Sequence, residues 1–211
     1  MPKQNRVTPA GEIIATPYRG TVMGNRGRLH DEGEKILRPF AVKRWIICKL
    51  EFNGRHRQVM APNRYTELFF LDEAVALAAG HRPCAECNRA RYNQFRELWA
   101  RANPQASLNW GGQGLPTANE LDNILHRERL TSNREKVVYR AELAELPDGV
   151  FVRFPGETTP YLVAGAELRP WTPAGYEKAV PRPAGVTVEV LTPASTVRTI
   201  TAGYRPGIYL K

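Results

Sequence analysis

Three cysteines offer the most specific chemistry in this sequence of 211 residues. Cys84 and Cys87 belong to the run Pro-Cys-Ala-Glu-Cys, at the expected start of a helix. Two thiolates three positions apart can both reach one metal ion, and the N-terminus of a helix favours their negative charge. Cys48 would supply a third sulfur ligand. In a reducing compartment, such a set of thiolates favours Zn²⁺.

Two histidines are candidates for the fourth ligand of this zinc site. His56 follows a turn after Cys48, and with the three cysteines it would form a Cys₃His site that joins a β-hairpin to the helix. His81, three residues before Cys84, is the alternative. A different interpretation is that Cys48 is only a buried strand residue and that the site holds no metal. The Cys-x-x-Cys spacing is also typical of redox pairs, but no βαβ pattern surrounds it here.

The segment from Phe70 to Arg89, FLDEAVALAAGHRPCAECNR, resembles the C-terminal half of the zinc domain of Ada-type DNA methylphosphotriester repair proteins. That family has a helix rich in Glu and Ala, followed by Ala-Gly-Tyr-Arg-Pro-Cys-x-x-Cys. The resemblance implies a Cys-ligated zinc beside the DNA backbone, with Cys84 and Cys87 as ligands and Arg82 close to phosphate. The family's earlier pair of cysteines, which includes the nucleophile of its methyl transfer, has at most Cys48 as a counterpart.

Positive charge is concentrated in the first half of the chain. The net charge is +9, and residues 1–101 carry 18 basic and 10 acidic side chains against 12 and 11 in residues 102–211. This asymmetry is expected if one lobe faces a polyanion, so it predicts a nucleic-acid partner, DNA more than RNA. The candidate contact residues are Arg19, Arg26, Arg28, Arg55, Arg57, Arg82 and Arg89, and the candidates for stacking on an unpaired base are Trp45 and Tyr65.

Two pairs of residues support alternative, catalytic interpretations. His30 and Glu32 form His-x-Glu, which together with Pro-Cys-x-x-Cys is the pattern of zinc deaminases. His126 and Glu128 could act as base and metal ligand of a metal-dependent nuclease, although positions i and i+2 do not share a helix face. A zinc-stabilised module that binds an acidic protein is the alternative outside nucleic-acid chemistry.

The elements that must position these residues are short, because Gly and Pro number 17 each. Val42–Phe52 and Arg57–Met60 are predicted as two strands of a hairpin around Asn53-Gly54. The other elements predicted in this half are a strand over Leu68–Leu71 and helices over Glu73–Ala79, Cys84–Ala102 and Ala118–Leu130.

Two of these helices carry clear sequence signals. Asp72 and Gly80 are typical of a helix start and a helix end. The second helix has an apolar stripe formed by Tyr92, Phe95, Leu98 and Trp99. The run Ala-Gly-His-Arg-Pro that ends at residue 83 has an echo, Ala-Gly-Tyr-Arg-Pro, that ends at residue 206. Because the second copy lacks cysteines, we expect the shared feature to be a structural helix stop.

From Val137 onward the pattern changes to β-branched and aromatic runs separated by Pro and Gly. The strands predicted there, which would form a small antiparallel sheet, are Val137–Leu143, Val150–Phe154, Tyr161–Val163 and Val186–Leu191. The sequence therefore predicts an α+β protein with a flexible arm over residues 1–17, a basic zinc-binding lobe over 18–134 and a small β-rich lobe over 135–211.

Composition also limits the compartment. No apolar run approaches the roughly 18 residues of a membrane-spanning helix, and no apolar signal segment follows the N-terminus. Three cysteines are too few for a disulfide scaffold. We therefore expect a cytoplasmic protein.

Overall fold

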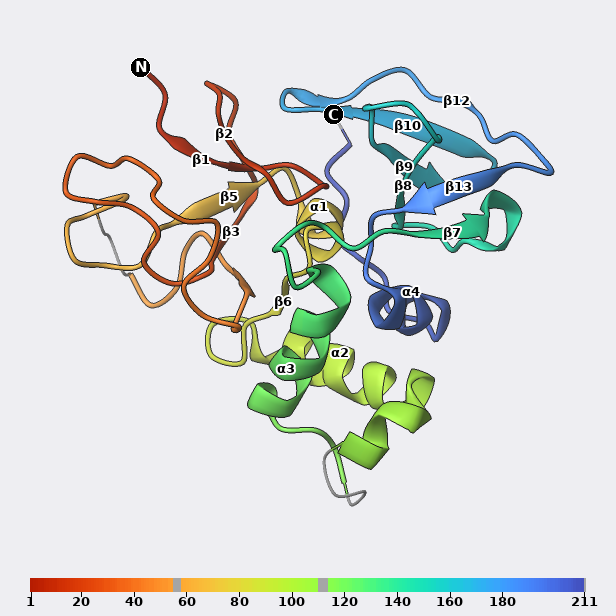
Figure 1. Ribbon diagram of the computed structural model, residues 1–211, viewed down its shortest axis with the longest axis horizontal. Helices are drawn as coiled ribbons and strands as arrows, with labels where there is room; N and C mark the ends of the chain where they lie inside the picture. Colours follow the sequence, from red (N-terminus) through yellow and green to blue (C-terminus); the bar gives the residue numbers. More distant parts are fainter. Residues whose placement is uncertain (55–57, 110–113, 211) are drawn as a thin grey trace.

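Two β-sheets and four α-helices make up the part of the chain that the structure describes (Figure 1). This computed structural model describes residues 1–54, 58–109 and 114–210. The first half of the chain forms one sheet and the second half the other, so the predicted α+β class is confirmed. None of the described helices has the length or the apolar character needed to cross a lipid bilayer.

The N-terminal sheet mixes parallel and antiparallel strands. In chain order its strands are β1 (Gln4–Val7), β2 (Ile13–Ala15), β3 (Val22–Asn25), β4 (Ile46–Cys48), β5 (Leu68–Phe70) and β6 (Arg82–Pro83). Their order across the sheet is β2-β1-β5-β3-β4-β6. β1 is parallel to β5 and β4 is parallel to β6, whereas the other neighbours are antiparallel.

The expectation of a flexible arm over residues 1–17 is wrong for most of that segment. β1 and β2 form an antiparallel pair in which Val7 faces Ile13, and β1 continues into the sheet by pairing with β5. Asn5 and Val7 are buried there. Strand pairing and burial therefore hold this polar, proline-containing segment in place, although its composition indicates neither.

The predicted hairpin around Asn53-Gly54 is also wrong. Both residues have the positive φ of a tight turn, at 53° and 62°. However, β4 covers only three residues of the first predicted strand, and it pairs with β3 and β6. Both edges of β4 are therefore occupied, and residues 58–60 lie in a coil and turn instead of a partner strand. The rest of the predicted second strand, at residue 57, lies outside the described residues.

Three of the four described helices match predicted segments, although the second begins five residues later than predicted. The four are α1 (Glu73–Ala78), α2 (Arg89–Ala102), α3 (Ala118–Arg129) and α4 (Ala194–Thr201), and short 3-10 turns cover Pro104–Asn109 and Leu143–Glu145. Asp72 caps α1 by accepting a hydrogen bond of 2.9 Å from the N–H of Val75. The apolar stripe of α2 is buried as predicted.

The two echoed runs end their helices in the same way. After α1, Gly80 has a φ of 89°, and the N–H of His81 donates to the carbonyl of Ala76 at 3.0 Å. After α4, Gly203 has a φ of 112°, and the N–H of Tyr204 makes the equivalent bond at 3.1 Å. Both are glycine-based helix stops, which confirms the structural interpretation of the echo.

The C-terminal sheet is antiparallel throughout, as predicted. Its strands are β7 (Tyr139–Glu142), β8 (Phe151–Arg153), β9 (Tyr161–Ala164), β10 (Glu167–Thr172), β11 (Gly175–Tyr176), β12 (Val180–Pro181) and β13 (Thr187–Val190). Their order is β11-β10-β9-β8-β13-β7, with β12 pairing to β10. The sequence patterns missed β10, β11 and β12. Prolines lie within β10 and β12, and β11 has only two residues, one of them glycine.

Side chains from both sheets share one hydrophobic core. Phe70 of the N-terminal sheet, Trp99 of α2 and Val152 of the C-terminal sheet belong to the same buried cluster. α1 lies between the two sheets, and all of its residues are buried (Figure 1). The basic N-terminal half is thus packed against the β-rich C-terminal half through α1.

Candidate metal centre and adjoining cleft

The parallel pairing of β4 with β6 brings Cys48 beside Cys84. Ile47 is paired with Pro83, and the N–H of Cys84 donates to the carbonyl of Ile47 at 2.9 Å. The next residue along each strand is a cysteine. The strand register therefore places two residues that are far apart in the sequence next to each other at this end of the sheet.

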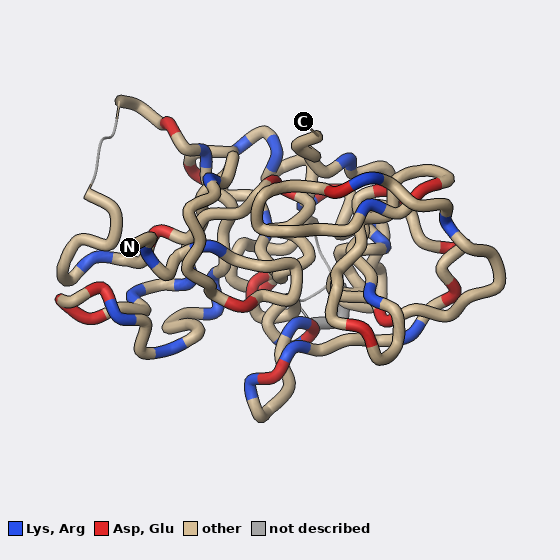
Figure 2. The backbone as a smooth tube through the Cα atoms, turned by 90° about the horizontal axis from the view of Figure 1, so that it is seen from above, with Lys and Arg blue, Asp and Glu red and all other residues tan. Residues whose placement is uncertain are grey.

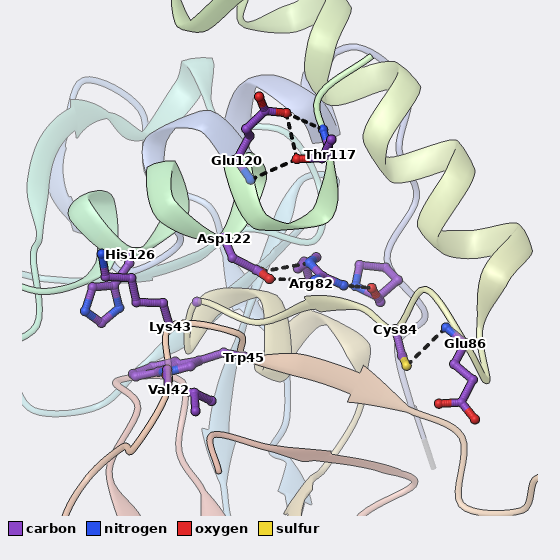
Figure 3. A network of polar contacts seen from close by, with 12 residues as sticks. Val42, Lys43, Trp45, Arg82, Cys84, Glu86, Thr117, Glu120, Asp122 and His126 are labelled. Carbon is purple, nitrogen blue, oxygen red and sulfur yellow. Dashed lines mark hydrogen bonds and ion pairs between the residues drawn. The ribbon is translucent and has the colours of Figure 1, made fainter. Parts of the chain in front are cut away.

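A turn brings the third cysteine to the same point. Residues 84–88 form this turn, and α2 begins only at Arg89, so the predicted start of the helix at Cys84 is too early. The N–H of Glu86 donates to Sγ of Cys84 at 3.4 Å (Figure 3). As a result, Sγ atoms of Cys48, Cys84 and Cys87 all lie within 4.8 Å of one another. We call this group the cysteine cluster.

The three sulfur atoms of the cluster are close enough to one another to bind a single metal ion. Zinc bound tetrahedrally at about 2.3 Å from each sulfur requires sulfur atoms roughly 3.8 Å apart. Cys48 and Cys84 are buried and Cys87 is half-buried, so a bound ion would be largely shielded from water. The three thiols fit the ion, and N–H donors such as that of Glu86 would orient and stabilise the thiolates.

Hydrogen bonding and burial give the three thiols of the cluster different pKa values. A bond from the Cys48 thiol, helped by the N–H groups of Glu86 and Cys87, lowers the pKa of Cys84 to about 5. The same bond to Cys84, together with burial, raises the pKa of Cys48. Burial also raises the pKa of Cys87. Cys84 is therefore the first thiolate to form, and the other two thiols would lose their protons when a metal binds.

No His, Asp or Glu of the described residues joins the three sulfur atoms. His81, the alternative fourth ligand, does not reach the cluster. Its ring packs against Trp45 and Phe70, with ring centroids 5.2 Å and 4.7 Å away, and its Nε2 accepts a bond of 3.3 Å from Arg26. His56, the other candidate, lies outside the described residues.

A cleft of about 720 Å³ lies over the cysteine cluster. Its floor is one face of the N-terminal sheet, because alternate side chains of a strand point to the same face. Met23 of β3 pairs with Phe69 on one side and with Cys48 on the other, which extends this face across three strands. The floor residues, drawn from β3, β4, β5, β6 and their ends, are Glu67, Phe69, Met23, Asn25, Ile46, Cys48, Arg82 and Cys84.

The walls of the cleft add charge, polar groups and aromatic rings. Arg44 and Lys49, which flank β4, are exposed and line it. Asn119, near the start of α3, is another exposed lining residue, and Phe52 and Tyr65 are half-buried ones. Tyr65, a predicted stacking residue, therefore does lie at this site. The cleft thus joins an apolar, sulfur-bearing floor to a rim with two exposed cations.

No protein-family model, curated protein or solved structure matches the chain.

Arg82, a predicted phosphate contact, is instead buried in a salt bridge. Its Nε and Nη2 donate to the two carboxylate oxygens of Asp122 at 2.9 Å and 2.7 Å (Figure 3). The side chains are only 1% and 4% exposed. Burial raises the pKa of Asp122, and the guanidinium of Arg82 opposes that shift. The pair ties β6, which carries Cys84 at its end, to α3, so the role of Arg82 is to hold the site in place.

Arg26 and Trp45 are also buried, at 1% and 2% exposure, so neither can contact nucleic acid as predicted. The guanidinium carbon of Arg26 lies 4.0 Å from the centroid of the Trp45 ring, and that of Arg129 lies 4.1 Å from it. These cation–π contacts place the three side chains in the interior. Arg19, Arg28 and Arg89 are exposed as expected, and the remaining predicted contacts, Arg55 and Arg57, lie outside the described residues.

The catalytic candidates do not converge on the cysteine cluster. His30 is buried, with Nδ1 2.6 Å from the hydroxyl of Thr66, and Glu32 is exposed. His126 packs edge-on against Phe40, and burial together with Arg129 lowers its pKa to about 4. Glu128 accepts hydrogen bonds from the N–H and hydroxyl of Ser195. Neither pair therefore forms the shared site that a deaminase or a nuclease would need.

Sequence reasoning missed Arg44, Lys49 and the sheet face beneath them. The signal was present as period-two alternation in short stretches, such as Met23 with Asn25 and Ile46 with Cys48. Stretches of three or four residues are too short to show which face would be left uncovered.

Proposed function

We propose that the cysteine cluster holds a zinc ion and that the surface around it binds nucleic acid, with DNA favoured over RNA. The observation that carries this proposal is the convergence of three sulfur atoms within 4.8 Å, in a cleft that exposed cations border. Three thiolates with N–H donors around them suit zinc better than a hard cation such as Mg²⁺. We keep His56 as the proposed fourth ligand.

The bound zinc would have a structural role. It would join β4 to the turn before α2, which are separated by more than thirty residues of sequence. Such a crosslink stabilises the folded chain, since the unfolded chain has no preformed site. The Arg82–Asp122 pair also ties β6, the neighbour of β4, to α3. Together, the zinc ion and this ion pair would hold the floor of the cleft in one conformation.

Exposed cations support a polyanionic partner. Arg19, Arg28 and Arg89 are on the surface, and Arg44 and Lys49 add charge at the cleft. Figure 2 shows Lys and Arg spread over the strands and loops of the N-terminal sheet, with Asp and Glu between them. The resemblance of residues 70–89 to a zinc domain of DNA repair proteins favours DNA. Phosphate contacts would dominate such binding.

Elemental analysis tests the metal. We expect about one zinc per chain in protein purified without chelator, and little in Cys48→Ser or Cys84→Ser. A control variant, Thr66→Ser, keeps a buried position on the same half of the chain and should keep its zinc. His56→Ala should lower the affinity for zinc if His56 is the fourth ligand. Wild-type protein without bound metal would overturn this part of the proposal.

A salt titration tests the partner. Fluorescence anisotropy would follow binding to mixed-sequence duplex DNA, single-stranded DNA, RNA and heparin. We expect nucleic acid to bind more tightly than heparin, with a steep fall in affinity as salt rises. Arg28→Gln and Arg89→Gln should each reduce the salt slope by about 1, whereas Arg140→Gln, at an exposed position of β7, should not. Equal, weak binding to every polyanion would favour the alternative of an acidic protein partner.

A further inference from the structure

The floor of the cleft contains an apolar row that ends at the cysteine cluster. Phe69, Met23 and Cys48 are neighbours across three strands, because Met23 pairs with both of the others. All three line the cleft, and Phe69 is half-buried. The guanidinium carbon of Arg6 lies 4.7 Å from the centroid of the Phe69 ring, so a planar ligand would stack on Met23 and on the part of Phe69 that Arg6 leaves uncovered.

Hydrogen-bonding groups lie on the same floor, one row away. Glu67 and Asn25 each stand two residues from a member of the apolar row and therefore share its face. Glu67 is only 4% exposed, and its Oε2 accepts a bond of 2.8 Å from the N–H of Met60, which fixes the carboxylate. Asn119 adds an amide from the wall. Carboxylate and amide groups are those that proteins use to read the edges of nucleobases.

Positive charge is placed at the rim instead of the floor. Arg44 and Lys49 stand before and after β4, and both are exposed. The one cation of the floor, Arg82, is neutralised by Asp122. A ligand that satisfies both regions has an uncharged, planar body for the floor and an anionic group for the rim.

We propose that this cleft binds one nucleotide unit, with its base on the floor beside the cysteine cluster and its phosphate at the rim beside Arg44, which shares the face of Ile46 and Cys48. A volume of about 720 Å³ leaves room for the sugar as well as the base, and it lies in the usual range of small-ligand sites. An acidic peptide would use the two cations but leave the apolar row without a planar partner. The unit can come from a free mononucleotide or from an unpaired nucleotide of a strand, and only the second source rests on the proposed function.

Oligonucleotides with and without bases separate the cleft from simple charge attraction. A single-stranded DNA and an abasic strand of equal length carry the same phosphates, and their affinities for the purified chain would be compared by anisotropy. We expect the intact strand to bind at least about fivefold more tightly, since stacking of one base contributes at this level. Equal affinities would overturn the proposal for strands, and a calorimetric titration with nucleoside monophosphates tests the free ligand.

Two variants and a matched control test whether the base binds in the cleft. Asn119→Trp adds bulk at an exposed position of the cleft wall, and it should reduce the difference between intact and abasic strands to less than about twofold. Asn123→Trp, the matched control one turn further along α3, is exposed but does not line the cleft, so it should keep the difference. Phe69→Leu keeps an apolar side chain but removes the ring, and it should act like Asn119→Trp.

The outcomes distinguish the two proposals. Mononucleotide binding that Asn119→Trp abolishes, without binding of any strand, would support the cleft and overturn the nucleic-acid function. Strand binding that neither bases nor these variants affect would support the nucleic-acid function and overturn the cleft. Thermal melts of each variant by circular dichroism establish that it is folded.

Discussion

Replacing Asp122 with Asn removes the negative charge that faces Arg82 while keeping the size of the side chain. In the wild-type chain, the carboxylate accepts two hydrogen bonds, of 2.9 Å and 2.7 Å, from one guanidinium. Both side chains are almost fully buried, at 1% and 4% exposure. In Asp122→Asn the amide oxygen can still accept one bond, but the charge of Arg82 remains in the interior without a counter-charge.

The expected cost follows from this burial. Removing one partner of a buried ion pair destabilises a protein by about 3–5 kcal/mol, and the retained acceptor of Asn favours about 3 kcal/mol here. For a chain of this length, that cost lowers the melting temperature by about 6–12 °C. The exposed pair Arg169–Glu167, with side chains 29% and 50% exposed, is the comparison, and Arg169→Gln should cost less than about 1 kcal/mol.

Urea unfolding followed by circular dichroism would measure these free energies for protein that retains its metal. The double variant Arg82→Met/Asp122→Leu should recover much of the stability that Asp122→Asn loses, because it removes both charges together. Zinc content of Asp122→Asn should also fall, since β6 carries Cys84 at its end. A cost below 1 kcal/mol for Asp122→Asn would refute the view that this pair holds β6 against α3.

Three other predictions follow from buried or constrained groups. Burial lowers the pKa of Lys136 to about 7, so the unfolded chain binds more protons than the folded chain between about pH 7 and pH 10. Stability should therefore rise with pH in this range, by up to about 1.4 kcal/mol per unit from this group, and Lys136→Met should remove that part of the rise in urea unfolding series. Gly80→Ala should lower the free energy of unfolding by more than about 2 kcal/mol, because φ is 89° and the new Cβ would lie 2.7 Å from the Cδ of Arg129. Gly54→Ala, with a φ of 62° and open space around it, should lower it by about 1 kcal/mol. EDTA should lower the melting temperature of the wild type but leave that of Cys84→Ser unchanged, and an identical melt of the wild type with and without EDTA would contradict a structural metal.

The sequence predicts the local parts of this fold well. The cap and the glycine stop of α1 are properties of a few adjacent residues, and so is the apolar stripe of α2. The closeness of Cys84 to Cys87 follows from spacing alone. The contribution of Cys48 could be proposed from its type, but its position beside Cys84 depends on the parallel pairing of β4 with β6, which no short-range pattern specifies.

The errors share one physical cause, which is that burial of polar side chains depends on distant partners. The sequence predicts Arg82 to be a surface cation, but it is buried in the interior, where Asp122 of α3 neutralises it. The sequence predicts Arg26 to contact phosphate, but its guanidinium packs on the buried ring of Trp45. The Asn53-Gly54 turn is real, but whether its flanks pair depends on which strands have already occupied the edges of β4.

The carboxylates at the start of α1 accept hydrogen bonds from the last part of the chain to be synthesised. Asp72 accepts bonds from the hydroxyl of Tyr176 and the N–H of Tyr209, at 2.8 Å and 3.0 Å. Glu73 accepts them from the hydroxyl of Tyr204 and the N–H of Gly207, at 2.5 Å and 2.8 Å. A ribosome that has made only the first half has not yet supplied these four donors. The nascent chain can form the bond from Val75 to Asp72 and the ion pair of Glu73 with Arg91, but a gene fragment that stops after α3 would encode two carboxylates that lack these four donors, which weakens the burial of α1.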